Sequence, residues 1–123
     1  MFNASPTTEV SGLFENSRPL DLICMGRVAV DLYAEQVYSS LEDAQSFRKY
    51  LGGCAGNTAI GTARLGLKSA MFSCVGTDDM GVYLRKTLEN EGVDTSLLRN
   101  TPEHLTALVL LGVSPPDRFP LIF

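Results

Sequence analysis

Short apolar runs that end at a glycine are the first pattern along this chain. Leu20–Met25 is followed by Gly26, and Ser69–Val75 is followed by Gly76. Nearly continuous apolar runs of this length are typical of strands whose two faces are both covered in a parallel sheet. We therefore predict two strands at these positions, each buried on both faces.

Two further segments place apolar residues three and four positions apart, as amphipathic helices do. The first is Gly56–Leu65, which ends at Gly66, and the second is Met80–Glu91, with Asp78 or Asp79 as its N-terminal cap. The expected packing residues are Ala59, Ile60 and Ala63 in the first helix, with Leu65 as a further candidate, and Val82, Tyr83, Leu84 and Leu88 in the second. Strands that alternate with helices predict an α/β fold with a parallel sheet.

Outside these elements, alternation of apolar and polar residues predicts strands with one exposed face. Glu35–Tyr38 and Phe47–Leu51 have this pattern, and Leu105–Leu111 and Phe119–Phe123 are two β-prone runs near the end. The segment between the last two contains Pro-Pro-Asp, which is typical of a hairpin connection. Residues 1–18 lack periodicity and are rich in Ser, Thr, Asn and Pro, so we expect a flexible extension there.

The composition supports a folded unit with an apolar core. The 123 residues are 45% hydrophobic and 20% charged, and 10 basic residues against 14 acidic ones leave a formal charge of -4. A protein that neutralises several phosphates needs a basic stripe, whereas the longest basic cluster here is the pair Arg48 and Lys49. The sequence therefore argues against nucleic acid as a partner.

The cysteines and the absence of a long apolar stretch bear on the compartment. Cys24, Cys54 and Cys74 are too far apart for a CxxC metal motif and odd in number, so we expect free thiols in a reducing environment. No apolar stretch reaches the roughly 18 residues that span a bilayer, and the first residues lack the pattern of a signal peptide. These features predict a cytoplasmic protein with no membrane partner.

Two glycine-rich segments are candidates for ligand chemistry. Gly61–Ser69 is one residue longer than a phosphate-binding P-loop and covers the end of a helix instead of its start, so the sequence does not support a P-loop. In Leu51–Ala59, two adjacent glycines precede a helix whose first turn carries Asn57, an amide that can bond a hydroxyl. A plain tight turn with Asn57 as an N-cap is the alternative interpretation.

Several fixed positions in Gly52–Gly76 together resemble the N-terminal signature of the ribokinase-like (PfkB) carbohydrate kinases. These positions are Gly52, Gly53, Ala55, Asn57, Ala59, Gly66 and Gly76. Asp21–Gly26 followed by Asp31 resembles the first strand of the family, and Val75–Gly81 resembles its V-G-x-D-x-x-G turn. The similarity covers residues 20–123, about the first third of such a kinase.

This resemblance implies a ribokinase-like three-layer α/β sheet, present as its N-terminal part over residues 19–123. It also implies a small β-lid made of residues 33–51 and 105–123, with Gly52 and Gly53 as its hinge. Such a lid closes over the sugar and excludes water, so the phosphoryl group goes to the sugar and not to solvent. In relatives the lid also forms a dimer contact, so we expect a homodimer through the lid.

The resemblance further assigns substrate binding to Asp31, Gly53 and Asn57. Asp31 and Asn57 would bond hydroxyls of a small sugar or sugar acid. From the residues alone, Asp31 could equally be a solvated loop acid. The pair Asp78-Asp79 fits a helix cap better than a catalytic role, and His104 has no neighbouring nucleophile or acid in the sequence and is interpreted as a surface residue.

The family uses ATP and Mg²⁺ and takes its catalytic base from a G-A-G-D motif near the C-terminus, and that motif does not occur in these 123 residues. We therefore expect an N-terminal fragment with no catalytic residue, no metal ligand and no retained ATP site, which is inactive alone. Within the family, the chain looks most like the kinases of 5-dehydro-2-deoxygluconate in inositol catabolism. The alternatives are a kinase of 2-keto-3-deoxygluconate, fructose or ribose, and a non-catalytic small-molecule binding or dimerisation module.

Overall fold

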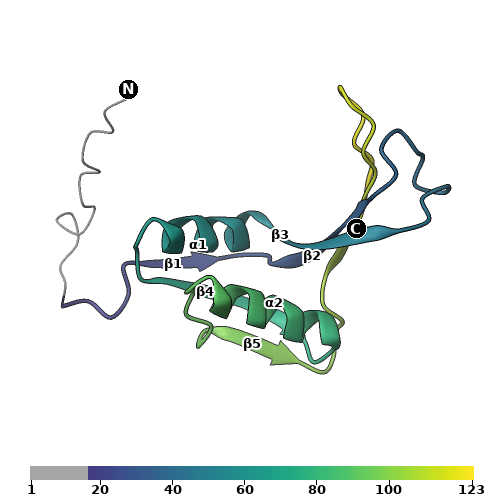
Figure 1. Ribbon diagram of the computed structural model, residues 1–123. Helices are drawn as coiled ribbons and strands as arrows, with labels where there is room; N and C mark the ends of the chain where they lie inside the picture. Colours follow the sequence, from purple (N-terminus) through teal and green to yellow (C-terminus); the bar gives the residue numbers. More distant parts are fainter. Residues whose placement is uncertain (1–16) are drawn as a thin grey trace, which may run out of the picture.

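The computed structural model describes residues 17–123, which form two sheets and two helices (Figure 1). The elements in chain order are β1 (Leu22–Met25), β2 (Ala29–Ala34), β3 (Phe47–Gly52), α1 (Cys54–Arg64), β4 (Ser69–Gly76), α2 (Asp79–Asn90), β5 (Leu98–Thr101), β6 (Leu108–Leu111) and β7 (Leu121–Ile122). The flexible extension expected at residues 1–18 lies almost wholly outside the described residues.

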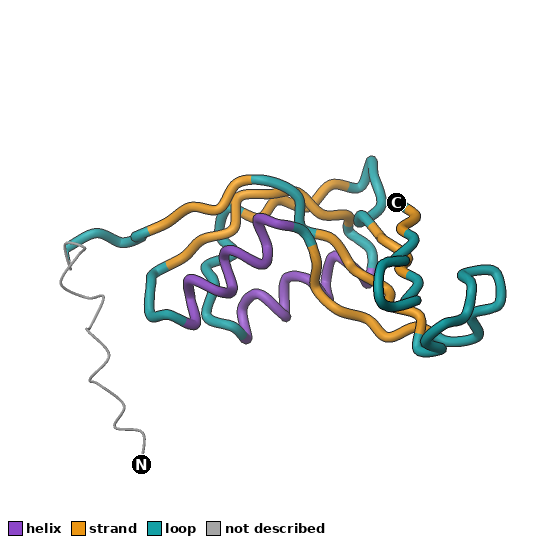
Figure 2. The backbone as a smooth tube through the Cα atoms, turned by 90° about the horizontal axis from the view of Figure 1, so that it is seen from above, coloured by secondary structure: helices purple, strands orange, loops and turns teal. Residues whose placement is uncertain are grey.

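The first sheet has the strand order β1-β4-β5, and both of its strand pairs are parallel. Helices α1 and α2 lie on the same face of this sheet (Figure 2). Met71 of β4 and Leu84 and Leu88 of α2 are fully buried between the two layers. The predicted strands near Leu20–Met25 and Ser69–Val75 are therefore confirmed, as is the parallel α/β arrangement.

The expectation that both faces of these strands are buried is wrong. Ile23 and Met25 of β1 and Phe72 of β4 are 50%, 74% and 44% exposed. Register pairs Met25 with Phe72, so these side chains share the face that carries no helix. Because the side-chain direction alternates along a strand, only every second residue reaches the helix layer. Strand β5 was not predicted, since only Leu98 in its four residues is buried.

The two predicted helices are confirmed with small shifts in their ends. The Asp78 side chain accepts hydrogen bonds from the backbone N–H groups of Met80 at 2.9 Å and Gly81 at 3.1 Å, so it is the cap of α2. Val82 was expected among the packing residues of α2 but is 46% exposed. The buried residues of this helix are Gly81, Leu84 and Leu88. Glycine is required there because a Cβ on Gly81 would lie 2.2 Å from the Gly76 carbonyl oxygen.

The second sheet has the order β3-β2-β6-β7, with β2 antiparallel to β3 and parallel to β6. The predicted hairpin near the end is confirmed, because β6 and β7 pair antiparallel. The strand predicted at Glu35–Tyr38 is wrong: the chain turns there, and Tyr38 has a φ of 70°. The Gln36 side-chain oxygen accepts a hydrogen bond from the backbone N–H of Gln45 at 3.0 Å, which closes the loop between β2 and β3.

Two contacts tie the second sheet to the first. Thr106, just before β6, donates its backbone N–H to the Asp78 carboxylate at 2.8 Å, and its hydroxyl accepts from the Gly76 N–H at 3.0 Å. On the other side, the Lys49 ammonium of β3 lies 4.0 Å from the centre of the Tyr83 ring on α2. The second sheet is therefore anchored to α2 and the residues just before it, through β3 on one side and through the segment that leads into β6 on the other.

Cys24, Cys54 and Cys74 are free thiols; Cys24 is buried, and the other two are exposed. Across residues 17–123, neither helix has the length and apolar character to cross a membrane.

Candidate functional site

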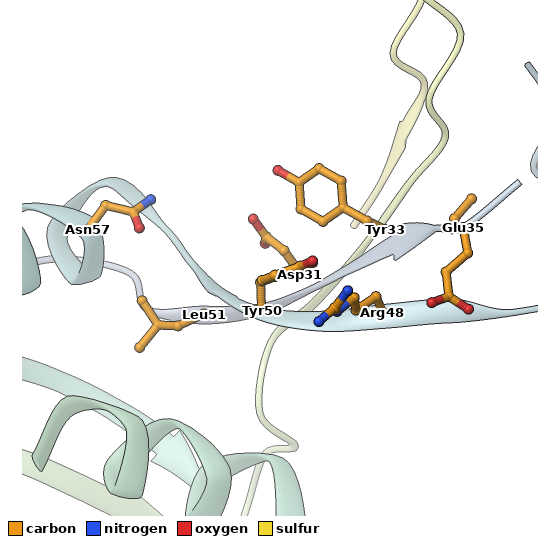
Figure 3. A pocket seen from close by; sticks show the side chains of 8 residues that line it. Asp31, Tyr33, Glu35, Arg48, Tyr50, Leu51 and Asn57 are labelled. Atoms are coloured by element: carbon orange, nitrogen blue, oxygen red, sulfur yellow. The ribbon is translucent and has the colours of Figure 1, made fainter. Parts of the chain in front are cut away.

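A pocket of about 660 Å³ opens where β2, β3 and the first turns of α1 meet (Figure 3). It lies beyond the carboxyl end of β1, because α1 begins next to the β1–β2 connection. Ligands of open α/β sheets bind at this end of the strands. The residues that line the pocket are Asp31, Tyr33, Ala34, Glu35, Arg48, Tyr50, Leu51 and Asn57.

Asp31 stands in the middle of β2, opposite Tyr50 of β3, and its carboxylate points into the pocket. The space for that carboxylate is provided by Gly52. A Cβ on Gly52 would lie 2.1 Å from the Asp31 Oδ2 atom, so a larger residue would have to displace the acid. Glycine at this position therefore has a local physical reason, which is the orientation of Asp31.

Burial raises the pKa of the Asp31 carboxyl above its ordinary value, and the positive charge of Arg27 opposes that rise. The desolvation effect is the larger of the two, because removal from water disfavours the charged form. A ligand that donates hydrogen bonds to the carboxylate would replace part of the lost hydration.

Asn57 is placed in the same pocket by α1, and it is not the cap of that helix. Gly53 is the residue at the N-cap position, and its carbonyl accepts the Asn57 backbone N–H at 3.0 Å. In Figure 3, the Asn57 amide and the Asp31 carboxylate point toward one open space, with the Tyr33 hydroxyl at its far side. The two polar side chains that the sequence singled out thus come from different elements and meet in one pocket.

Gly53 borders the pocket without being among its lining residues. Its φ of 94° lies in the left-handed region, and a Cβ there would lie 2.4 Å from the Arg27 carbonyl oxygen. Both facts require glycine, because other residues rarely adopt this conformation and have no room at this point. The tight turn between β3 and α1 is therefore confirmed, while the hinge and substrate-binding roles of Gly53 stay predictions.

Four lining residues were not recognised from the sequence: Tyr33, Glu35, Arg48 and Tyr50. Tyr33 and Tyr50 pack edge to face with ring centres 5.5 Å apart, and the Arg48 guanidinium carbon lies 5.8 Å from the centre of the Tyr50 ring. The signal that could have found them is the two-residue period of the strands. Arg48 and Tyr50 alternate on β3 and pair with Tyr33 and Asp31, so Tyr33, Arg48 and Tyr50 share one face of the sheet with Asp31. Glu35 lies just after the end of β2.

Residues 17–123 contain no group of three or more His, Cys, Asp or Glu side chains close enough to hold a metal ion. Asp78 caps α2, as its sequence position suggested, and His104 is exposed. The segment Gly61–Ser69 runs from the end of α1 into β4, which is the reverse of a phosphate-binding strand-to-helix loop. These segments therefore add no second polar site to the pocket beside β2.

A polar pocket beyond the carboxyl ends of the strands is typical of α/β proteins that bind small ligands. A family model described as "pfkB family carbohydrate kinase" matches residues 20–121, so the chain belongs to that family. The predicted ribokinase-like α/β fold is confirmed by solved structures of the family.

Named relatives agree with this assignment. A 5-dehydro-2-deoxygluconokinase from Geobacillus kaustophilus is 36% identical over 104 residues, which cover 84% of this chain and 31% of that protein. The structure of a PfkB protein from Polaromonas sp. JS666 matches with a TM-score of 0.78 at 37% identity. That match covers 84% of this chain and 34% of the Polaromonas protein. A sugar kinase from Pyrococcus horikoshii in complex with ATP has a TM-score of 0.77 at 30% identity, with coverage of 82% and 33%. The chain thus spans about a third of the length of these relatives.

Proposed function

We propose that this chain is the acceptor-binding part of an ATP-dependent kinase that phosphorylates 5-dehydro-2-deoxygluconate. The observation that carries the proposal is the meeting of Asp31 and Asn57 in one pocket of about 660 Å³ beyond the end of β1. The volume suits a small sugar acid. Support for the particular acceptor comes from the curated relatives at 34–43% identity that have this name.

In this proposal, Asp31 accepts hydrogen bonds from substrate hydroxyls and Asn57 bonds a further hydroxyl. A partly buried carboxylate that must be paired discriminates against analogues without the matching hydroxyls, because its oxygens would then lose both water and ligand. Gly52 contributes by leaving room for the acid, since any Cβ there would occupy the place of the carboxylate.

The G-A-G-D motif, from which the family takes its catalytic base, does not occur in these 123 residues. In this proposal the chain therefore contributes the acceptor site, and neither the catalytic base nor the nucleotide site is assigned to it. Solved relatives in complex with ATP, or with ATP and Mg²⁺, support nucleotide use in the family. On this basis the chain alone binds the acceptor and does not turn it over.

The second sheet is proposed as the lid, including residues 33–51 and 105–123, with Gly52 and Gly53 as the hinge. The structural support is that Gly52 ends β3 and Gly53 alone connects it to α1, with a φ of 94° at Gly53. A cluster of exposed apolar residues in and beside β7 also supports a homodimer contact; it consists of Phe119, Leu121, Ile122 and Phe123. The molar mass in solution, measured by light scattering, tests the dimer directly.

The test of acceptor binding is titration calorimetry of the chain with 5-dehydro-2-deoxygluconate. We expect binding by the wild type, loss of at least tenfold in affinity in Asp31→Asn, and no change in Asp117→Asn, an exposed acid on the β6–β7 loop. Equal binding by both variants would contradict the assignment of the site. Tighter binding of 2-keto-3-deoxygluconate, fructose or ribose would replace the named acceptor with that sugar.

An ADP-release assay with the same chain separates the kinase part from its alternative, a non-catalytic binding module. Clear turnover by the chain alone would contradict the placement of the base outside it. Turnover that appears only when the remainder of a full-length kinase is joined to residue 123 supports the proposal, and acceptor binding without turnover in that fusion favours the binding module.

A further inference from the structure

The pocket contains one feature that hydroxyl binding does not use, and this is the cation of Arg48. Of the eight side chains that line the pocket, Arg48 alone is positively charged, whereas Asp31 and Glu35 are acids. A neutral sugar has no need of a cation among these residues. An acidic sugar would be repelled by the two carboxylates unless a positive charge compensated them.

We propose that Arg48 binds the carboxylate of an acidic sugar and so sets the preference of this pocket for sugar acids over neutral sugars. This inference rests on the proposed function, in which Asp31 and Asn57 hold the hydroxylated part of the same ligand. Arg48 is thereby a specificity-determining residue for the acceptor and takes no part in proton or phosphoryl transfer.

The register of the second sheet places Arg48 at a suitable distance from Asp31. Asp31 pairs with Tyr50, and the next pair on the same face is Tyr33 with Arg48. Two residues along a strand separate the pairs by about 7 Å. Arg48 and Asp31 therefore face the same space from successive positions on one face of the sheet. A sugar acid a few carbons long can contact Asp31 with its hydroxyls and Arg48 with its carboxylate.

The Arg48 guanidinium is held without using its hydrogen-bond donors. Its carbon lies 5.8 Å from the centre of the Tyr50 ring, and Tyr50 is itself braced edge to face by Tyr33 at 5.5 Å. Among residues 17–123 no carboxylate lies within ion-pair distance of Arg48, and the charge that acts on Asp31 is that of Arg27. A guanidinium supported by an aromatic ring in this way keeps its planar edge available for a bidentate carboxylate.

The Lys49 side chain shows that position and not charge alone decides this role. Lys49 is the neighbour of Arg48 on β3, but it points to the opposite face of the sheet, where its ammonium contacts Tyr83 of α2 at 4.0 Å. The two adjacent basic residues are thus divided between a structural contact and the pocket.

The experiment compares one ligand with its uncharged counterpart. Calorimetric affinities of the chain are measured for 5-dehydro-2-deoxygluconate and for its carboxamide, which keeps the hydroxyls and removes the charge. The wild type is expected to bind the acid about ten- to a hundredfold more tightly than the amide, as for a hydrogen-bonded ion pair. Arg48→Gln should lose that preference and keep the affinity for the amide, and Arg48→Lys should keep part of the preference.

Arg99→Gln is the matched control, because Arg99 is an exposed arginine on β5 and does not line the pocket. It should leave both affinities unchanged. Retention of the acid preference in Arg48→Gln would overturn the inference, as would loss of both ligands in that variant, which would show a structural role. If the wild type binds the acid and the amide equally, the inference is overturned and the proposed function stands. If the wild type binds neither ligand, the proposed function itself is overturned.

Discussion

The two sheets of this protein differ in what their side chains do. The β1-β4-β5 sheet packs one face against α1 and α2, and the sheet and its two helices together contain most of the buried apolar residues, among them Met71 of β4 and Leu84 and Leu88 of α2. The β3-β2-β6-β7 sheet has few fully buried side chains and carries the pocket, with Tyr33 and Tyr50 at 38% and 44% exposure. Stability and ligand recognition are thus assigned to different sheets, which meet at Gly52–Gly53 and at Thr106.

The largest expected effect is the loss of stability caused by a core truncation in the first region, which is the β1-β4-β5 sheet with α1 and α2. The second region is the β3-β2-β6-β7 sheet. Leu84→Ala removes a fully buried side chain and should lower the free energy of unfolding by about 2–5 kcal/mol. Leu121→Ala, at a half-exposed position of the second sheet, should change it by about 0.5 kcal/mol or less. Urea unfolding of both variants measures the difference, and similar losses would show that the second sheet contributes equally to stability.

The next effect concerns the junction between the regions. Gly53→Ala forces a side chain into a φ of 94° and toward the Arg27 carbonyl, and the strain should cost about 1–3 kcal/mol. Gly61→Ala is the matched control, because Gly61 lies in α1 with open space around its Cβ position, and it should stabilise the chain by about 0.5–1 kcal/mol. Thermal unfolding compares them, and equal effects would remove the conformational argument for Gly53.

Gly52→Ala should separate binding from stability. Its Cβ would displace the end of the flexible Asp31 side chain, so we expect acceptor affinity to fall at least about tenfold while the unfolding midpoint changes little. Unchanged affinity in this variant, measured by calorimetry, would mean that the position of the Asp31 carboxylate does not matter for the ligand.

The pH dependence of stability tests the burial of Asp31. Because its pKa is higher in the folded chain, its contribution to stability is complete below the unfolded value of about 3.9 and is lost as pH rises through the folded value. Asp31→Asn should therefore gain stability relative to the wild type between pH 4 and pH 7. Asp78 acts in the opposite sense, because hydrogen bonds led by the Thr106 N–H lower its pKa, so its contribution is lost as pH falls below that range.

The smallest expected effect is on the surface of the first region. Arg64 and Glu91 form two hydrogen bonds of 2.6 and 2.7 Å, and the Arg64 guanidinium lowers the pKa of Glu91. Both groups are in contact with solvent, so salt screens the pair. Glu91→Gln should shift the urea midpoint less than any variant above, and the shift should disappear at high salt. A shift that persists there would assign the pair a larger role.

Much of the first region was predictable because its signals are local. The two apolar runs, the helical spacing and the Asp78 cap each depend on residues within one or two turns of each other. Two of the errors came where a segment lies at a sheet edge or in a loop. Strand β5 has only one buried residue, and the alternation in Glu35–Tyr38 is overridden by a turn closed by the Gln36 side chain.

By itself the sequence determined the α/β class and the position of the glycine turn, because spacing and turn chemistry act over short distances. The substrate-binding roles of Asp31 and Asn57 were predicted from the resemblance to the PfkB kinases. The tertiary structure alone decided that Gly52 makes room for Asp31, and that Tyr33, Arg48 and Tyr50 share its face. These relations depend on the register between β2 and β3, whose paired residues lie up to 23 positions apart, from Ala29 to Gly52. Register is a property of two strands together, so a pattern within either strand cannot reveal it.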